Sequence, residues 1–352
     1  MSTTWIIVAL LLGFLVVFQI AKASEYVAIL KGEEKTRKES NRINAFLLLI
    51  FLIVGLFGVW YCNERLGGKI LPESASEHGE KIDLMMWITL GITGFVFVLT
   101  QVLLFWFSFK YQEKENQKAY YFPHDNRLEV IWTVIPAIVL TVLVGFGLYY
   151  WFQITGEAPA NAQVVEVTGS QFKWEFRYPG KDNILGRKYY KEINETKSNP
   201  LGQIWSDVNN HDDVVVSTEV HLIVGRPVKF IINAKDVIHD VGLVHFRMKM
   251  DAVPGLPTTM WFTPKYTTRQ MKEKYGQDFT YELSCDQMCG AGHYGMRGTL
   301  VVETEAEFKA WMAQKKPQYA IANESTQPAA PAQPGGAAKA DSAAKTVASL
   351  KP

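Results

Sequence analysis

Long apolar runs fill the first part of the chain and short alternating segments fill the rest, with the change near residue 155. A helix that spans a bilayer needs roughly 17 to 25 predominantly apolar residues. Runs 45–62, 84–109 and 130–154 meet this length, and run 5–20 approaches it. The pattern therefore predicts a membrane α-helical N-terminal half with four candidate spans.

Run 5–20 could also be the apolar region of a signal peptide, because Ala21-Lys22-Ala23 resembles a small-residue cleavage site. Signal peptides carry a positively charged region before the apolar run. No Lys or Arg precedes run 5–20, so we favour a retained helix.

The basic residues predict the orientation of the spans. Loop 21–44 carries six Lys and Arg, loop 63–83 carries three, and loop 110–127 carries four. Because cytoplasmic loops carry an excess of Lys and Arg, loops 21–44 and 110–127 are expected in the cytoplasm. Both chain ends, and everything after residue 154, then lie on the periplasmic side of a bacterial inner membrane.

From residue 162, short segments rich in Val, Ile, Phe and Tyr alternate with Gly, Pro, Asn and Asp, which is typical of β-strands. The expected strands are 163–167, 172–178, 214–217, 219–224, 228–234, 279–283 and 298–302. Strands of this number and length predict an all-β sandwich or barrel. Segment 179–213 is interpreted as an irregular surface loop and 304–315 as a helix capped by Thr304 and Glu307. The Ala- and Pro-rich chain after Tyr319 is expected to be disordered.

Charge excludes one class of partner. The formal net charge is only +1 over 352 residues. The sequence also has no basic stripe with interleaved aromatic residues, which is the usual electrostatic footprint of a nucleic-acid-binding protein. We therefore expect the membrane, and no nucleic acid, as a partner.

The most specific chemistry lies in residues 285–296, which place soft metal ligands within one short loop: Cys285, Cys289, His293 and Met296. A disulfide is a serious alternative in an oxidising compartment, but it explains neither the imidazole nor the thioether. Zinc would leave the thioether as an unusual ligand. A mononuclear blue-copper site would leave one thiolate surplus. Two bridging thiolates suit two coppers, each of which takes one imidazole.

A second imidazole must then come from elsewhere in the β-rich region. The candidates are His239, His245, His211 and His221. A lone histidine near a strand is usually structural. We prefer His239, because it follows an expected strand and can reach the Cys loop across the end of a sandwich.

These residues resemble a known family. The segments DVIH at 236–239 and MDAVPG at 250–255, with C-x3-C-x3-H-x2-M at 285–296, closely resemble subunit II of haem-copper cytochrome c oxidases, and the likeness runs from about residue 128 to 311. The resemblance implies a cupredoxin-like β-domain that holds the dinuclear copper centre CuA. The implied copper ligands are His239, Cys285, Cys289, His293, Met296 and the backbone carbonyl of Gln287.

The chain departs from the family at two positions. The family usually has Glu where this chain has Gln287, and that Glu side chain helps to bind Mg²⁺ or Mn²⁺ at the boundary with subunit I. An amide can still ligate a hard cation but brings no charge, so this second metal stays open. Phe172 replaces the Trp through which cytochrome c delivers its electron, while Trp174 keeps the second aromatic position. Phe172 suggests a donor bound in a complex, and Trp174 is at least equally consistent with an ordinary core residue.

The resemblance also implies that Glu129 lies near the entrance of a proton channel into subunit I. The alternative is an interfacial carboxylate stabilised by a helix N-terminus. The family has two membrane helices, so the expected division is 1–83 for two additional N-terminal helices and 84–155 for a transmembrane hairpin. Residues 156–318 form the periplasmic β-domain and 319–352 the tail.

The expected function is electron transfer within a respiratory terminal oxidase, coupled to proton translocation. Electrons would come from cytochrome c, or from a cytochrome c domain of a bound complex, and pass to haem in subunit I, where oxygen is reduced. Other oxidase subunits are expected partners. A quinol oxidase subunit would lack the copper ligands, and a membrane-tethered copper-delivery protein would need an α/β pattern. A nitrous-oxide reductase would need a large propeller.

Overall fold

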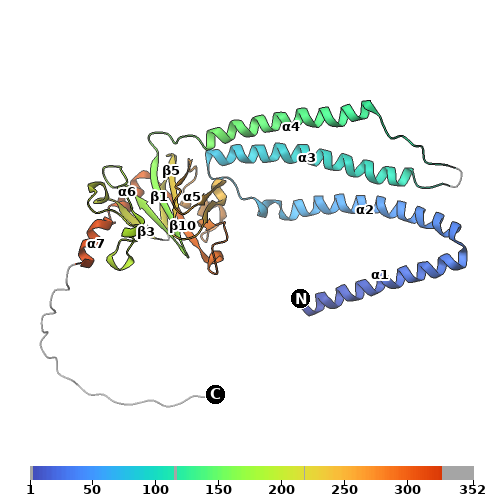
Figure 1. The fold of residues 1–352 in the computed structure, drawn as a ribbon, viewed down its shortest axis with the longest axis horizontal. Coiled ribbons are helices and arrows are strands. Elements are labelled where there is room, and N and C mark those ends of the chain that lie inside the picture. The colour runs from blue at the N-terminus through green and yellow to red at the C-terminus, as the bar shows by residue number, and fades with distance from the viewer. Residues whose placement is uncertain (1–2, 115–116, 218, 327–352) are drawn as a thin grey trace, which may run out of the picture.

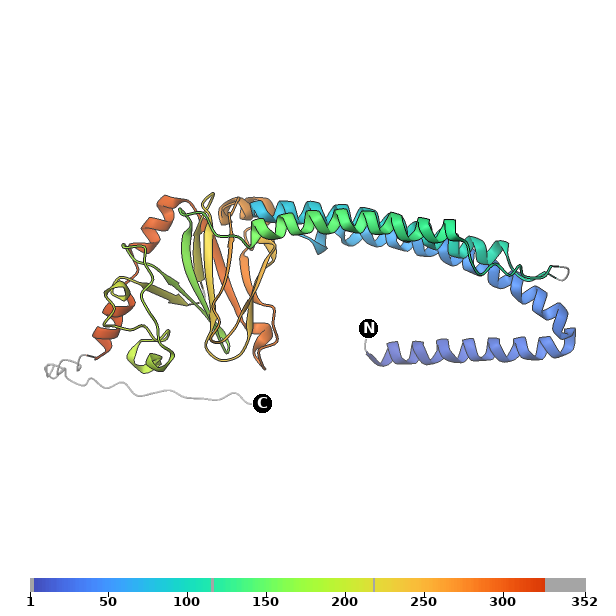
Figure 2. The same ribbon diagram turned by 45° about the horizontal axis from the view of Figure 1, so that its top comes forward.

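The computed structural model describes residues 3–114, 117–217 and 219–326. Its first half consists of four long helices, which are α1 (Thr3–Lys31), α2 (Glu33–Ile70), α3 (Glu77–Lys110) and α4 (Asn126–Ile154). Each is long and apolar enough to cross a membrane, which confirms the four predicted spans. Helices α2, α3 and α4 lie side by side and extend away from the β-domain, while α1 turns back at the far end of α2 (Figures 1 and 2). Helix α1 runs without interruption through Ala21-Lys22-Ala23.

The second half is a sandwich of two five-stranded sheets. The first sheet has the order β3 (Val214–Ser217), β2 (Lys173–Tyr178), β1 (Gln163–Ser170), β5 (Val228–Ala234) and β8 (Thr258–Phe262). The second has the order β4 (Glu219–Ile223), β10 (Arg297–Glu303), β9 (Tyr281–Cys285), β6 (His239–Leu243) and β7 (Met248–Ala252). Strand β1 runs parallel to β5, and β4 runs parallel to β10, while the other pairs are antiparallel. The predicted fold class is therefore confirmed.

The core lies between the two sheets. Apolar side chains with almost no exposed surface come from both inner faces, and they include Val167, Phe176, Leu222, Phe230 and Leu283. At about 25 cal/mol per Å² of apolar surface, their burial is the main force that closes the sandwich. The closed sandwich gives the loops at its ends a stiff support.

The sequence did not predict strands β6, β7 and β8 or helix α5 (Thr268–Tyr275). Strand β6 is buried at every position, so it shows no alternation, and β7 contains no β-branched residue. Strand β8 (Thr258–Phe262) was also missed, as was α5 (Thr268–Tyr275), although Thr267 and Gln270 form a capping box at its start. The predicted helix 304–315 is confirmed as α6 (Glu305–Met312), with the capping box between Thr304 and Glu307.

The prediction of disorder after Tyr319 is wrong for its first residues, which belong to α7 (Gln318–Thr326). This helix is held by its N-terminal turn. Gln318 donates its backbone N–H to the Asp213 carbonyl at 2.8 Å, and the Tyr319 ring stacks on His211 with 3.9 Å between centroids. Residues 327–352 lie outside the described part of the chain.

Segment 179–213 is also more ordered than predicted. It contains three short 3₁₀ helices, η1 (Tyr190–Glu192), η2 (Glu195–Lys197) and η3 (Val208–Asn210). Several of its polar residues are buried, and the segment attaches to β2 through an ion pair between Arg177 and Asp213. It is therefore a packed cap on the sandwich, because contacts distant in sequence replace the missing local pattern.

The connection between α2 and α3 joins the membrane helices to the β-domain. Ala75 donates its N–H to the His245 carbonyl at 2.7 Å, and its own carbonyl accepts the Lys265 N–H at 2.8 Å. Arg247 binds Asp83 of α3 at 2.7 Å. The β-domain is thus fixed at the outer end of α3 by backbone and side-chain contacts.

Candidate metal centre

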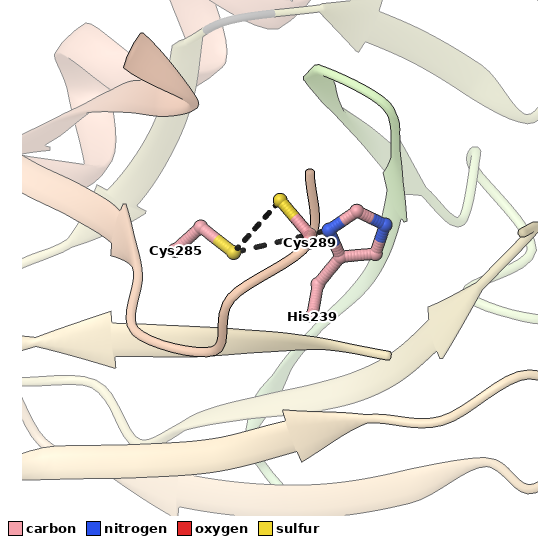
Figure 3. Close-up of side chains that lie close together, drawn as sticks. All are labelled: His239, Cys285 and Cys289. Carbon is pink, nitrogen blue, oxygen red and sulfur yellow. Dashed lines mark hydrogen bonds between the residues drawn. The ribbon is translucent and has the colours of Figure 1, made fainter. Parts of the chain in front are cut away.

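One end of the sandwich brings together loops that are far apart in sequence. Cys285 is the last residue of β9, and the loop that follows returns to β10 after Met296. The Cys285 N–H donates to the Met296 carbonyl at 3.2 Å, which closes this loop at its base. His239 is the first residue of β6, whose Val241 pairs with Cys285. Figure 3 shows the His239 ring and the two thiols converging from these elements.

Six potential ligand atoms form a chain of close contacts. The Cys285 and Cys289 sulfurs are 3.8 Å apart. His239 Nδ1 lies 3.8 Å from the Cys285 sulfur, and His293 Nδ1 lies 3.7 Å from the Cys289 sulfur. The Met296 sulfur is 3.8 Å from the Cys289 sulfur, and the carbonyl oxygen of Gln287 is 3.2 Å from the Cys285 sulfur. Every ligand atom that the motif predicted is therefore in one cluster.

The two cysteines are free thiols, since 3.8 Å is far longer than the roughly 2.05 Å of a disulfide bond. Burial, and then the neighbouring Cys285 thiol, raise the pKa of Cys289 to about 11. A thiol in such a place ionises when a cation replaces its proton. The donor set of two thiols, two imidazoles, a thioether and a carbonyl suits a soft metal, and two central sulfurs flanked by one imidazole each fit a pair of coppers.

The orientation of His239 is set by Asp236. His239 Nε2 lies 2.8 Å from Asp236 Oδ1. Burial is the largest influence on Asp236 and raises its pKa, but the N–H groups of Gln171 and Val237 and the His239 ring outweigh it, so the pKa is lowered. The carboxylate can only accept, so Nε2 carries the proton and Nδ1 is left free on the cysteine side.

The other histidine candidates lie elsewhere. His245 packs edge-on against Phe279 at 5.2 Å between centroids. His211 stacks on Tyr319, and His221 stacks on Trp311 at 3.9 Å. Among the described residues, the group that could hold a metal contains only His239 of these four.

The two aromatic residues singled out in the sequence have different positions. Phe172 is 40% exposed, and its ring lies against the backbone of the Cys loop, where a Cβ added at Gly292 would be 2.5 Å from the ring. Trp174 is 0% exposed and lies edge-on to His239 at 5.9 Å. A soluble partner could therefore reach Phe172 but not Trp174.

Gln287 and Glu129 are both exposed at their predicted places. Gln287 is exposed, while its backbone carbonyl accepts from the Cys285 thiol at 3.2 Å. Glu129 lies in the first turn of α4, where Asp125 is the N-cap. The sequence interpretation missed Gln171 as a site residue, since nothing local marks its 2.6 Å hydrogen bond to the Cys289 carbonyl. Asp236 could have been identified from its spacing of three residues before His239.

Comparison with known proteins gives consistent matches along the chain. The family model for the transmembrane domain of cytochrome c oxidase subunit II matches residues 64–149, and that for its periplasmic domain matches residues 163–304. The chain is 36% identical over 236 residues to the alternative cytochrome c oxidase subunit 2 of Bradyrhizobium diazoefficiens, covering 67% of this chain and 80% of that one. It is 27% identical over 257 residues to cytochrome c oxidase subunit 2 of Cereibacter sphaeroides, covering 71% and 81%. The crystal structure of the periplasmic domain of subunit II of a Bradyrhizobium japonicum cytochrome oxidase matches with a TM-score of 0.31 and 19% identity, over 45% of this chain and 95% of that one.

Proposed function

This chain belongs to the cytochrome c oxidase subunit II family, and we propose that it is the subunit through which electrons reach a haem-copper terminal oxidase. Family membership makes it a membrane protein with a periplasmic domain and a component of the oxidase complex. The proposal adds that it holds a dinuclear copper centre, accepts electrons from a cytochrome c and passes them to haem in subunit I. A bacterial inner membrane is the proposed location.

The convergence of six donors carries this proposal. The donors of His239, His293 and Met296 and the carbonyl oxygen of Gln287 each contact the sulfur of Cys285 or Cys289, and these two sulfurs contact each other. When bound, a pair of coppers held by these residues would supply a site that gains and loses one electron with little change in bond lengths. The protein supplies the stiff support, because His239 and Cys285 are strand-end residues and Met296 directly precedes β10.

The surroundings favour electron transfer over catalysis. His239, Cys285, Cys289 and Met296 are all buried, so the ligand atoms leave little room for a substrate. His293 is half-buried and Gln287 is exposed, so the cluster approaches solvent at these two residues. Oxygen reduction is assigned to subunit I, and translocation of protons to the complex.

Phe172 is the proposed contact for the electron donor. Its ring touches the Cys loop on one side and is open on the other, which makes it a short route from a docked haem to the thiolates. Because Phe172 takes the place of a Trp, we propose a donor that is held in a complex. Stopped-flow reduction by added soluble cytochrome c tests this, and rapid saturable turnover would contradict a bound donor.

Glu129 is proposed to lie at the entrance of the proton channel into subunit I. Its position in the first exposed turn of α4 supports this role as well as that of a carboxylate stabilised by the helix dipole. Glu129→Gln should slow proton uptake by the intact oxidase. Unchanged turnover would assign the residue to the structural role.

Copper analysis and electron paramagnetic resonance of the full-length chain test the central proposal. The wild-type protein should be purple and give a mixed-valence signal from a copper pair. Cys289→Ser should abolish that signal, whereas Cys62→Ser is the matched control, since Cys62 is exposed and lies outside the cluster. A colourless protein that contains one zinc ion would overturn the proposal.

A further inference from the structure

The copper ligands are linked by a ring of hydrogen bonds that passes through three loops. Asp236 Oδ1 accepts from the His239 ring at 2.8 Å, and Asp236 Oδ2 accepts the Gln171 backbone N–H at 2.7 Å. The Gln171 side chain then donates Nε2–H to the Cys289 carbonyl at 2.6 Å. The ring closes through the two sulfurs, since Cys289 contacts the Cys285 sulfur and the Cys285 sulfur contacts His239 Nδ1.

Asp236 is the charged member of this ring, and its carboxylate bonds both His239 and the β1–β2 turn. One oxygen fixes the protonated nitrogen of His239, and the other fixes the β1–β2 turn that carries Phe172. The carboxylate also accepts the Val237 N–H at 2.8 Å, so its own position is fixed. Charge-assisted bonds of this kind are roughly twice as strong as neutral ones.

The Phe172 side of the ring packs closely against the Cys loop. A Cβ added at Gly290 would lie 2.9 Å from Gln171 Nε2 and 3.1 Å from the Phe172 ring. Gly290 also has φ +132°, a conformation that other residues rarely adopt. The Cys loop, Gln171 and Phe172 therefore fit together only with glycine at this position.

We propose that Asp236 is a positioning residue that couples the copper ligand His239 to Phe172, the proposed contact for the electron donor. It fixes the His239 tautomer before metal arrives, and it holds Phe172 against the Cys loop through Gln171. The inference rests on the proposed function of the site. The role of Asp236 at His239 can be tested separately from copper binding, because the ring consists of contacts between protein atoms and exists without metal.

The test compares Asp236→Asn with Asp286→Asn in the full-length chain. Asp286 follows Cys285 directly and bonds Ser284 at 2.7 Å, so its replacement removes a nearby negative charge without touching His239. His239 and the Gln171 N–H bond different oxygens of Asp236, and asparagine replaces one of these oxygens with an NH₂ group that only donates. In the native geometry Asp236→Asn therefore loses one of the two bonds. ¹⁵N magnetic resonance of histidine-labelled metal-free protein reports the tautomer, with the His239 signals identified by their loss in His239→Gln.

Asp236→Asn should shift the His239 ring toward a mixture of tautomers and lower copper affinity about 10- to 100-fold. In the copper-loaded protein it should raise the reduction potential, because a negative charge that favours the oxidised centre is lost, and it should slow reduction by the donor. Asp286→Asn should leave the tautomer unchanged. An unchanged tautomer in Asp236→Asn, or an equal change in both variants, would overturn the inference.

Gln171→Ala provides a second test if Asp236→Asn folds poorly. It removes the bond to Cys289 but keeps the backbone N–H that binds Asp236, so it should slow donor reduction while the His239 tautomer stays fixed. Donor reduction at the wild-type rate in Gln171→Ala would refute the coupling to Phe172. If wild-type protein takes up no copper, the proposed function fails, yet the tautomer measurement still decides the role of Asp236 at His239.

Discussion

Arg177→Met should strongly destabilise the β-domain, because Arg177 is 0% exposed and neutralises two buried carboxylates. Its guanidinium donates to Asp213 at 2.9 Å, to Glu166 at 3.1 Å and to the Gly186 carbonyl. Without it, Glu166 still has Lys188 at 2.6 Å. Asp213 keeps only the Gly186 N–H at 3.3 Å, and its other oxygen has no partner among the described residues. The change therefore leaves one uncompensated buried carboxylate.

Removing one partner of a buried ion pair costs about 3 to 5 kcal/mol, and we expect about 3 because Glu166 stays paired. A domain of this size loses about 2 to 4 °C per kcal/mol, so the unfolding midpoint should fall by roughly 6 to 12 °C. The assay is thermal unfolding of the full-length chain in detergent, followed by circular dichroism of the strands. Arg187→Met is the matched control, since Arg187 is exposed and pairs with Asp207 at 3.0 Å, and it should change stability by less than about 0.5 kcal/mol.

The defect should also depend on pH. Burial raises the pKa of Asp213 to about 6 even with Arg177 in place, and loss of Arg177 raises it further. A carboxyl whose folded pKa lies above its unfolded value of 3.8 stabilises the fold fully below pH 3.8 and loses that contribution as pH rises through the folded pKa. Arg177→Met should therefore be less destabilised at pH 5 than at pH 8, and Arg177→Met with Asp213→Asn should recover most of the loss at pH 8. A loss below about 1 kcal/mol, or equal losses at both pH values, would refute this reasoning.

Three further predictions concern separate parts of the β-domain. Met296 is fully buried, and leucine has nearly the same volume. Met296→Leu should therefore lower the free energy of unfolding by less than about 1.5 kcal/mol and keep the copper-pair signal. It should raise the reduction potential in a redox titration, since fewer donors favour the reduced state; a lost signal would make Met296 indispensable for assembly. Burial lowers the pKa of His245 below 6.5, so stability should fall as pH drops below 6.5, and His245→Phe should remove that component of acid unfolding; an unchanged pH profile would contradict it. Thr304→Ala, which removes the cap of α6, should cost about 0.5 to 2 kcal/mol in thermal unfolding, and Thr299→Ala is a comparison at an exposed strand position.

Local patterns predicted the features that depend on neighbouring residues. The four spans follow from the length of the apolar runs, and α6 follows from the capping box that precedes it. The loop from Cys285 to Met296 supplies four of its donors within one hairpin connection, so spacing alone indicated a soft-metal site. Strand β6 was missed because it is buried at every position and so shows no alternation, and β7 was missed because it has no β-branched residue, although its burial alternates.

Segment 179–213 and α7 show the same limit. Neither has a regular hydrophobic pattern, yet Arg177 holds the segment to β2, and Gln318 joins α7 to Asp213. Sequence composition described these regions as loop and tail, because a buried ion pair or a backbone contact between distant residues leaves no mark in the local composition.

Local sequence patterns are enough to identify the membrane half, the β-rich half and the candidate metal donors of the Cys loop. The distant groups that complete the candidate site follow only from the folded arrangement. Pairing of Val241 with Cys285 brings His239 to the thiols, and the parallel alignment of β1 with β5 brings Gln171 to Asp236. Strand register sets these contacts. Register depends on how the two sheets bury their inner faces, and no local stretch of the chain specifies that packing.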